Sequence, residues 1–486
     1  MLFSGIPFLY YFLPTVLLLY FTAPKSIKNF VLLVASLFFY AWGEPKIVMI
    51  MIASILVGYI SGLLIEAFRH LKVAKAVMIL SVLIQIGCLV YYKYMDFFIE
   101  NINRGFGMQI PLLRIALPVG ISFYTFQILS YTVDVYRGEK AQRNPINLAA
   151  YIAMFPQLIA GPIVRYKDVA PQLEVKDAWK LRWKQGKCVR EKAEEGRSIT
   201  GEDIAYGIRR FVLGLGKKVL IANQLGELCD LFRGSQDKTV VFYWVYAIAF
   251  SLHVYFDFSG YSDMAIGLGR IFGFRFLENF NYPFISGSVT EFWRRWHISL
   301  GSWFRDYVYI PLGGNRVPKW RWYFNILVVW MLTGFWHGAA WNFVVWGLYF
   351  ALLLVLEKQF LLKIFEKYKI IGHVYVLPVI VISFVIFNAT DMREAIQYIG
   401  GMFGFGGVSL VSEEAVYYLR NYGVVLLAAL VGATPIVKKL CRAVMAKKWC
   451  QKAIFVLEPA VFVALWLVIT AYLVDGSFNP FLYFRF

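Results

Sequence analysis

Charge is scarce in this sequence. Only 16% of its 486 residues are Asp, Glu, Lys or Arg, whereas 59% are hydrophobic, and the mean hydropathy is +0.60. Apolar runs long enough to cross a bilayer recur along the chain, and no polar stretch between them is long enough to fold as a separate soluble domain. The composition excludes an ordinary soluble protein and predicts one all-α integral membrane domain over residues 1–486.

Several motifs that would indicate other chemistries are missing. There is no G-x-S-x-G nucleophile elbow, no Walker A sequence and no GxGxxG loop, which argues against a serine hydrolase and against nucleotide hydrolysis. The histidines are dispersed without an H-x-x-x-H pair, so we predict no metal site. The five cysteines form no C-x-x-C pair, and we expect free thiols.

Acidic residues are outnumbered, with 30 against 49 basic residues and a net charge of +19. Such a balance could indicate nucleic acid, but the Lys and Arg residues cluster between apolar segments, as the positive-inside rule predicts. We therefore expect no nucleic-acid partner. The basic faces would instead contact anionic membrane lipids and gather an anionic donor, such as a coenzyme A thioester, from the cytosol.

The apolar runs predict the order of spans and loops. A broken apolar segment at 151–165 suggests a re-entrant hairpin, a charged cytosolic loop follows at about 165–203, and an outer loop is expected at 388–420. The chain would end outside the membrane in an aromatic tail at about 475–486. The expected spans are roughly 6–21, 30–42, 46–66, 74–92, 204–221, 240–258, 340–356, 374–387, 423–437 and 455–474.

The stretch 291–349 concentrates polar residues within this apolar sequence. His337 stands between Trp336 and Gly338, and desolvation there would disfavour the imidazolium, leaving a neutral ring able to accept a proton as a general base. The structural alternative is a buried histidine that bonds a carbonyl and joins two helices. Gly334 and Gly338 favour the first interpretation, since they permit a close backbone approach around a narrow pocket.

A second histidine, His297, follows two arginines in the same stretch. Arg294 and Arg295 could contact phosphate groups of a donor or of lipid, although arginines beside a tryptophan belt also snorkel to the interface. A third polar group precedes them, where His253 and Asp257 would share one face of a helix and could pair, either to stabilise packing or to orient the base.

Five motifs follow one another along the second half of the chain: YFDFSGYSDMAIG (255–267), NFNYPF (279–284), FWRRWHISL (292–300), YIPLGG (309–314) and TGFWHG (333–338). In this order they closely resemble the membrane-bound O-acyltransferase family. The likeness extends over nearly the whole chain and is greatest to the bacterial alginate O-acetyltransferase branch, which is similar to the teichoic-acid D-alanyltransferase and peptidoglycan O-acetyltransferase membrane proteins.

This resemblance implies a bundle of about eleven transmembrane helices with re-entrant segments and a central tunnel, in the bacterial cytoplasmic membrane. It implies that His337 is catalytic and that His297 is a second site residue. It further implies an acyl thioester, acetyl-CoA or an acyl-carrier protein, as co-substrate with no bound cofactor. The expected partners are a polysaccharide acceptor and an extracytoplasmic acyltransferase of the serine-hydrolase type.

The aromatic tail FLYFRF (481–486) is similar to a partner peptide of related D-alanylation systems, in which a tyrosine can carry the acyl group. Tyr483 is therefore a candidate acyl relay, and its alternative role is that of an aromatic anchor at the membrane surface.

The sequence thus predicts an enzyme that moves an acyl group, by default acetyl, from a cytosolic thioester across the membrane for O-acylation of an extracellular or cell-wall polysaccharide. Three alternatives stay open: D-alanyl transfer toward teichoic acid, a transporter or flippase, and a scaffold of a secretion complex. The absence of inverted internal repeats argues against the transporter.

Overall fold

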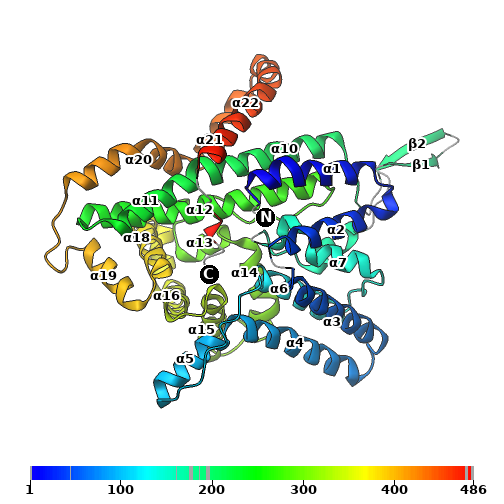
Figure 1. The fold of residues 1–486 in the computed structure, drawn as a ribbon, viewed down its shortest axis with the longest axis horizontal. Helices are drawn as coiled ribbons and strands as arrows, with labels where there is room; N and C mark the ends of the chain where they lie inside the picture. The colour runs from blue at the N-terminus through cyan, green and yellow to red at the C-terminus, as the bar shows by residue number, and fades with distance from the viewer. Residues whose placement is uncertain are drawn as a thin grey trace. The chain divides into compact units, whose positions relative to one another are not determined.

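The computed structural model describes residues 3–43, 45–159, 161–173, 179–184, 187–192, 197–476 and 480–482. Its described part is helical almost throughout (Figure 1). Chain contacts divide it into a first unit, Met1–Phe211 with Ser262–Leu277, and a second unit, Val212–Tyr261 with Glu278–Phe486. The expectation of a single domain stays a prediction.

The first unit contains nine complete helices among its described residues. Small residues let its helices pack closely: a Cβ on Gly58 of α3 would lie 2.7 Å from the side chain of Ile128 on α6, and one on Gly62 would overlap Tyr131. Helix α6 is consequently buried along most of its length. The helices are α1 (Leu13–Thr22), α2 (Lys28–Ala41), α3 (Val48–Ala67), α4 (Lys72–Lys93), α5 (Met95–Phe106), α6 (Ile121–Tyr136), α7 (Pro145–Ala153), α8 (Phe155–Leu158) and α9 (Tyr166–Val169).

The segment expected to be broken is indeed irregular. Helix α7 ends at Ala153, α8 covers one turn, and the described residues from Leu148 to Val164 are largely buried. An irregular segment is tolerated at membrane depth when it is surrounded by protein, because protein groups can then form hydrogen bonds with its backbone.

The charged loop is more structured than the sequence indicates. It contains an antiparallel hairpin of β1 (Trp179–Lys184) and β2 (Lys187–Lys192), which the all-α prediction did not include. Arg197, which belongs to the predicted charged loop, is 1% exposed. Its guanidinium donates to Asn29 Oδ1 at 2.7 Å and lies 4.2 Å from the ring centroid of Phe274, so the end of the loop is anchored in the first unit.

Two long helices run from one unit into the other: α10 (Gly201–Gly216) and α12 (Val240–Ile271). The other helices of the second unit are α11 (Asn223–Gly234), α13 (Val289–Arg295), α14 (Ile298–Phe304), α15 (Lys319–His337), α16 (Trp341–Leu356), α17 (Leu362–Lys367), α18 (Lys369–Asn388), α19 (Met392–Met402), α20 (Glu413–Gly432), α21 (Ile436–Met445) and α22 (Lys448–Asp475). Short π-helical segments interrupt the chain at Pro7–Phe12, Lys217–Ala222, Arg305–Tyr309 and Glu357–Leu361.

Helices α15 and α16 lie side by side in the second unit (Figure 1). Glycines make this approach possible, because a Cβ on Gly334 would overlap the carbonyl oxygen of Phe343, and one on Gly347 would overlap that of Trp330. Close packing of the two helices fixes the end of α15, where the TGFWHG motif lies.

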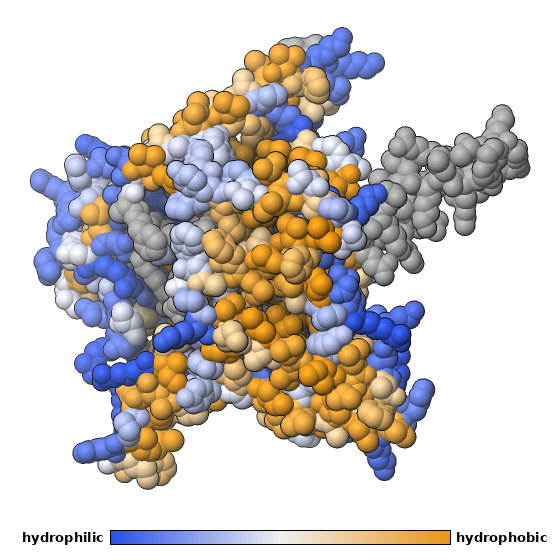
Figure 2. Space-filling model, turned by 45° about the vertical axis from the view of Figure 1, so that its right-hand side comes forward, coloured by the Kyte–Doolittle hydropathy of each residue, from blue (hydrophilic) through white to orange (hydrophobic). Residues whose placement is uncertain are grey.

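Among the described residues, six helices are long and apolar enough to cross a membrane: α3, α4, α12, α18, α20 and α22. In the most apolar 18-residue stretch of α22 only 6% of the stretch is buried, and in the corresponding stretch of α20 only 17% is buried. Apolar helices exposed on most sides require an apolar solvent, so we assign these surfaces to lipid. In Figure 2 hydrophobic residues cover much of the surface in view, and the most hydrophilic residues lie largely at its margins.

The predicted outer loop at 388–420 differs from the structure. It contains the whole of α19, which Asp391 caps by accepting from the backbone N–H of Glu394 at 2.8 Å, and the first turns of α20. Helix α19 is short and amphipathic rather than apolar, so a search for apolar runs passed over it.

Candidate active site

Helix α13, which carries the FWRRWH motif, is fixed at its start by two acceptors. Ser288 Oγ accepts from the backbone N–H of Glu291 at 3.0 Å. The carboxylate of Glu357, fully buried, accepts from the backbone N–H of Val289 and from both the backbone N–H and the hydroxyl of Thr290, the latter two at 2.8 and 2.7 Å. Both acceptors form hydrogen bonds with the free N–H groups at the start of the helix. The negative charge of the carboxylate also interacts favourably with the positive end of the helix dipole.

His297 lies at the junction between α13 and α14. Its φ of +45° places it in the left-handed region, and it is 1% exposed. The backbone of a residue other than glycine is strained in this conformation and keeps it only where contacts with the surrounding residues hold it in place. Such strained residues are common at functional sites.

The partners of His297 define which ring nitrogen carries the proton. Asn279 Oδ1 accepts from the backbone N–H of Ser299 at 3.2 Å and from its hydroxyl at 2.9 Å. Because a backbone N–H can only donate, this Asn279 atom must be the oxygen. His297 Nδ1 lies 3.2 Å from the same oxygen and 3.4 Å from the hydroxyl oxygen of Ser299. An N–H on Nδ1 satisfies the contact with Asn279, and in that neutral tautomer Nε2 is the unprotonated nitrogen, a hydrogen-bond acceptor and base.

A cavity of about 470 Å³ opens beside this histidine. Its wall combines aromatic and apolar side chains with His297 and three basic residues, Arg294, Arg305 and Lys358. Desolvation and the positive charge of Arg294 lower the pKa of Lys358, and the neighbouring carboxylate of Glu357 opposes this effect. Two cations facing one cavity favour an anion between them.

The structure gives the two predicted arginines different surroundings. Arg294 lines the cavity. Arg295 instead forms an ion pair with Glu291 at 2.8 Å and donates to the backbone carbonyl of Asn281 at 3.2 Å. Of these two arginines, only Arg294 is therefore placed to contact a ligand in this cavity. Arg295 stabilises α13 and its neighbouring loop.

His337 is the last residue of α15 and is half-buried. Its ring makes edge contacts with Trp346 and Phe387, both at 5.2 Å between centroids. Thr333, one turn earlier on α15, lines the 470 Å³ cavity, whereas His337 is not part of that wall.

The two histidines nevertheless belong to one neighbourhood. The ring of Trp336 lies 6.1 Å from that of His297 and 5.0 Å from that of His337, so both histidines contact the same indole. The structure thus brings together two residues forty positions apart, one of them on the cavity wall.

The third polar group is arranged differently from the predicted pair. Nδ1 of His253 lies 2.7 Å from the carbonyl of Ala222, to which it donates. Asp257 pairs with Lys218 at 2.6 Å. Each side chain therefore has a partner on another element, and neither contributes to the cavity of His297.

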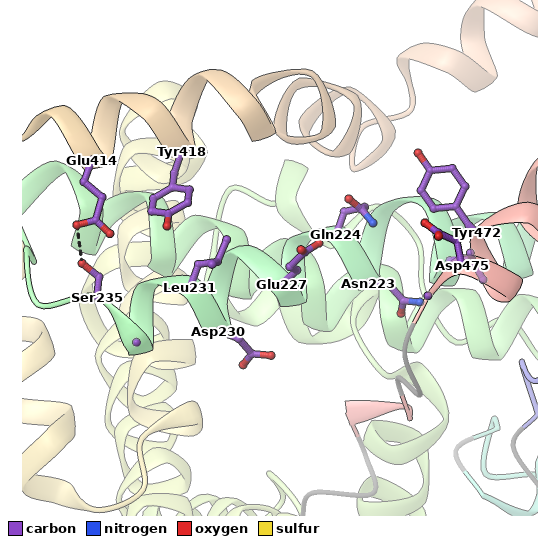
Figure 3. Close-up of a pocket in the computed structure, with 13 residues that line it drawn as sticks. Asn223, Gln224, Glu227, Asp230, Leu231, Ser235, Glu414, Tyr418, Tyr472 and Asp475 are labelled. Carbon is purple, nitrogen blue, oxygen red and sulfur yellow. Dashed lines mark hydrogen bonds between the residues drawn. The ribbon is translucent and has the colours of Figure 1, made fainter.

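A second and larger cavity, of about 960 Å³, lies between α11, α20 and the end of α22 (Figure 3). Its labelled side chains are almost all polar, and Glu414 accepts from the hydroxyl of Ser235 at 3.0 Å. Four carboxylates line it, from Glu227, Asp230, Glu414 and Asp475. No histidine is part of its wall, so the 470 Å³ cavity is the better candidate for chemistry.

Sequence reasoning missed four residues of the site, Asn279, Arg305, Glu357 and Lys358. Asn279 belongs to the NFNYPF motif, but only the folded chain shows that it orients a histidine eighteen residues away. The predicted relay Tyr483 lies outside the described residues.

Comparisons with known proteins agree with these motifs. A model of the membrane-bound O-acyltransferase family matches residues 47–392. A probable alginate O-acetylase AlgI of Pseudomonas aeruginosa is 40% identical over 415 residues, covering 84% of this chain and 75% of the relative. A peptidoglycan O-acetyltransferase of Helicobacter pylori is 31% identical over 490 residues, 93% of this chain and 89% of the relative. A teichoic acid D-alanyltransferase of Bacillus subtilis is 32% identical over 263 residues, 52% of this chain and 61% of the relative.

The family model covers residues of both units and includes all four predicted residues of the central stretch, His297, His337, Arg294 and Arg295. The chain belongs to the membrane-bound O-acyltransferase family.

Proposed function

We propose that this chain is a membrane O-acetyltransferase that serves the O-acetylation of an extracellular polysaccharide. The observation that supports it most is that His297, on a cavity with basic walls, and His337 both contact the ring of Trp336. The names of the similar proteins from Pseudomonas aeruginosa and Helicobacter pylori support acetyl as the acyl group and a polysaccharide or peptidoglycan as the final acceptor.

The donor would be a cytosolic acetyl thioester, either acetyl-CoA or an acetylated carrier protein. Both carry phosphate groups, which suit the basic wall formed by Arg294, Arg305 and Lys358. The acetyl group would then extend along the apolar part of the cavity toward His297. Enclosure by tryptophans excludes water, which otherwise hydrolyses the thioester.

In the proposed reaction His337 acts as general base and removes the proton of an acceptor hydroxyl. The hydroxyl oxygen attacks the acetyl carbonyl carbon, the carbon–sulfur bond breaks, and the proton on His337 passes to the leaving thiolate. His297, whose Nε2 accepts but does not donate, positions a hydroxyl or amide N–H group of the reactants. The products are an acetyl ester and a free thiol.

The finer architecture belongs to the same proposal. About eleven helices would cross the membrane, the shorter apolar helices joining the six long ones, and a central tunnel would connect the donor cavity with the acceptor side. Tyr483 would receive the acetyl group and pass it outward to a serine-hydrolase-type acyltransferase, the proposed partner. Membrane lipids would surround the bundle.

The test is a reconstitution with purified protein in liposomes and acetyl-CoA labelled in the acetyl group. Acceptor-dependent release of free CoA, with label appearing in an ester, is the expected result. A transporter would move label without consuming thioester. Parallel reactions with a D-alanyl carrier protein distinguish the second acyl group, and exclusive use of that donor would contradict the acetyl assignment.

A further inference from the structure

The described end of the chain, Pro480–Leu482, is inserted into the second unit. Phe481 is 1% exposed and Leu482 is 8% exposed. Helix α22 ends at Asp475, beside Asn223 and Gln224 at the edge of the polar cavity (Figure 3), and the chain is buried again from Phe481. A surface anchor would leave these apolar side chains facing lipid or water.

A buried ion pair contacts this segment. Lys218 Nζ lies 2.6 Å from Asp257 Oδ1, and their side chains are 0% and 4% exposed. Each partner also bonds the backbone of the tail: Nζ donates to the carbonyl of Pro480 at 3.2 Å, and Asp257 Oδ2 accepts from the N–H of Leu482 at 2.9 Å. Two opposite charges thus recognise one acceptor and one donor, two residues apart.

The side chain between these two backbone bonds completes the contact. The ring of Phe481 lies 4.7 Å from Lys218 Nζ, in cation–π geometry, and 5.0 Å from the ring of Tyr261, edge to face. Carbonyl, ring and N–H of three successive residues are each bound. The ring contact fixes the register of the peptide, because a shift by one residue would replace Phe481 with Pro480 or Leu482, neither of which has an aromatic ring.

An ion pair that only joined α12 to the segment before α11 would require no tail. Burying two charges is favourable only when further hydrogen bonds satisfy them, and here those bonds come from the tail backbone. The docked residues also line, with His253 and Asp230, a small cavity, and Asp230 lines the polar cavity of Figure 3 as well. Pro480 and Leu482 therefore line a small cavity that shares Asp230 with that polar cavity.

We propose that Lys218, Asp257 and Tyr261 form a peptide-docking site for the C-terminal segment, and that they are positioning residues for acetyl transfer. The residue that follows the site is Tyr483. The docking site holds the chain immediately before the proposed relay, and it would accept a separate peptide of the same sequence. The role in transfer rests on the proposed function, whereas docking itself does not.

The experiment compares the wild type with the double variant Lys218→Met/Asp257→Leu in membranes. Removing both charges avoids an unpaired buried charge, so the variant keeps its fold while losing both bonds to the tail. The matched control is Arg210→Met/Asp263→Leu, which removes an ion pair of 2.6 Å between the same two helices, α10 with its π-helical continuation and α12.

The first measurement is digestion by carboxypeptidase, which needs no enzyme activity. We expect the tail of the double variant to be removed at least tenfold faster than that of the wild type and of the control. Equal rates in all three proteins would overturn the docking site. This arm gives its answer even if the protein transfers no acetyl group.

The second measurement is acetyl transfer by a chain ending at Gly476, supplied with a synthetic peptide of residues 477–486. Restored transfer, at least tenfold above background, is expected when Lys218 and Asp257 are present and is expected to be lost in the double variant. If the double variant has a released tail but full activity, the positioning role is overturned although the docking site stands.

Discussion

Replacing Asn279 with Ala tests the arrangement of protons on His297. The substitution removes the oxygen that accepts from His297 Nδ1, at 3.2 Å, and from the hydroxyl and backbone N–H of Ser299. A neutral hydrogen bond contributes about 1 kcal/mol net. If this bond selects the tautomer with a free Nε2, its loss lowers kcat by about fivefold, because about 1.4 kcal/mol corresponds to a factor of ten.

The same substitution leaves two buried donors of Ser299 without this acceptor, which costs roughly 1–3 kcal/mol of stability. Activity must therefore be normalised to folded protein, measured by thermal unfolding in detergent. Asn281→Ala is the matched control, since that side chain is exposed and stands two positions along in the same motif. We expect it to retain wild-type kcat.

A double-mutant cycle with His297→Ala isolates the coupling. If Asn279 acts through His297, the double variant is no slower than His297→Ala alone. Multiplying effects, or an Asn279→Ala enzyme with undiminished kcat at equal abundance, would refute the tautomer argument.

Three further predictions concern the surroundings of the two histidines. Arg294→Ala should raise the KM for the thioester by about tenfold or less with little change in kcat, as expected of a partly exposed phosphate contact. Arg295→Ala should leave this KM unchanged. Steady-state kinetics over a range of acetyl-CoA concentrations distinguish the two variants. Glu357→Ala should lower the stability of the protein by about 2 kcal/mol, because the start of α13 loses its buried acceptor, and an unchanged melting temperature in detergent would contradict that role. Tyr483→Phe keeps the ring and removes the hydroxyl, so acetyl transfer to polymer should fall by at least tenfold; full transfer would leave Tyr483 as an anchor only.

The lengths of the apolar runs in the sequence predicted most of the long helices. The runs at 46–66 and 74–92 correspond closely to α3 and α4, since a lipid-facing helix must be apolar along its whole length. The prediction failed where helices are not apolar: α19 within the expected loop, and the β1–β2 hairpin within the charged segment. Capping by Asp391 and the amphipathic period are the local signals for α19.

The candidate site was predictable only in part. Placing histidine or arginine inside a membrane costs free energy, so the presence of His297, His337 and Arg294 in an apolar sequence was enough to indicate a functional site. Their partners did not, because nothing local links Asn279 to His297 or Glu357 to the start of α13.

The π-helical segments explain a further part of what the sequence could not show. Lys218 lies in one and Glu357 with Lys358 in another, and a π-helical turn shifts the direction of the following side chains in a way that a period of 3.6 does not predict. The docking of Pro480–Leu482 likewise depends on contacts more than 200 residues apart in the chain.

The most direct test of the account is the rate of acetyl transfer by His337→Ala in liposomes, with His70→Ala, an exposed histidine outside the site, as control. A general base contributes about 10²–10⁴-fold, so we predict a loss of that size at unchanged abundance and melting temperature, with the His70→Ala enzyme at wild-type rate. Wild-type transfer by a folded His337→Ala enzyme would contradict the account.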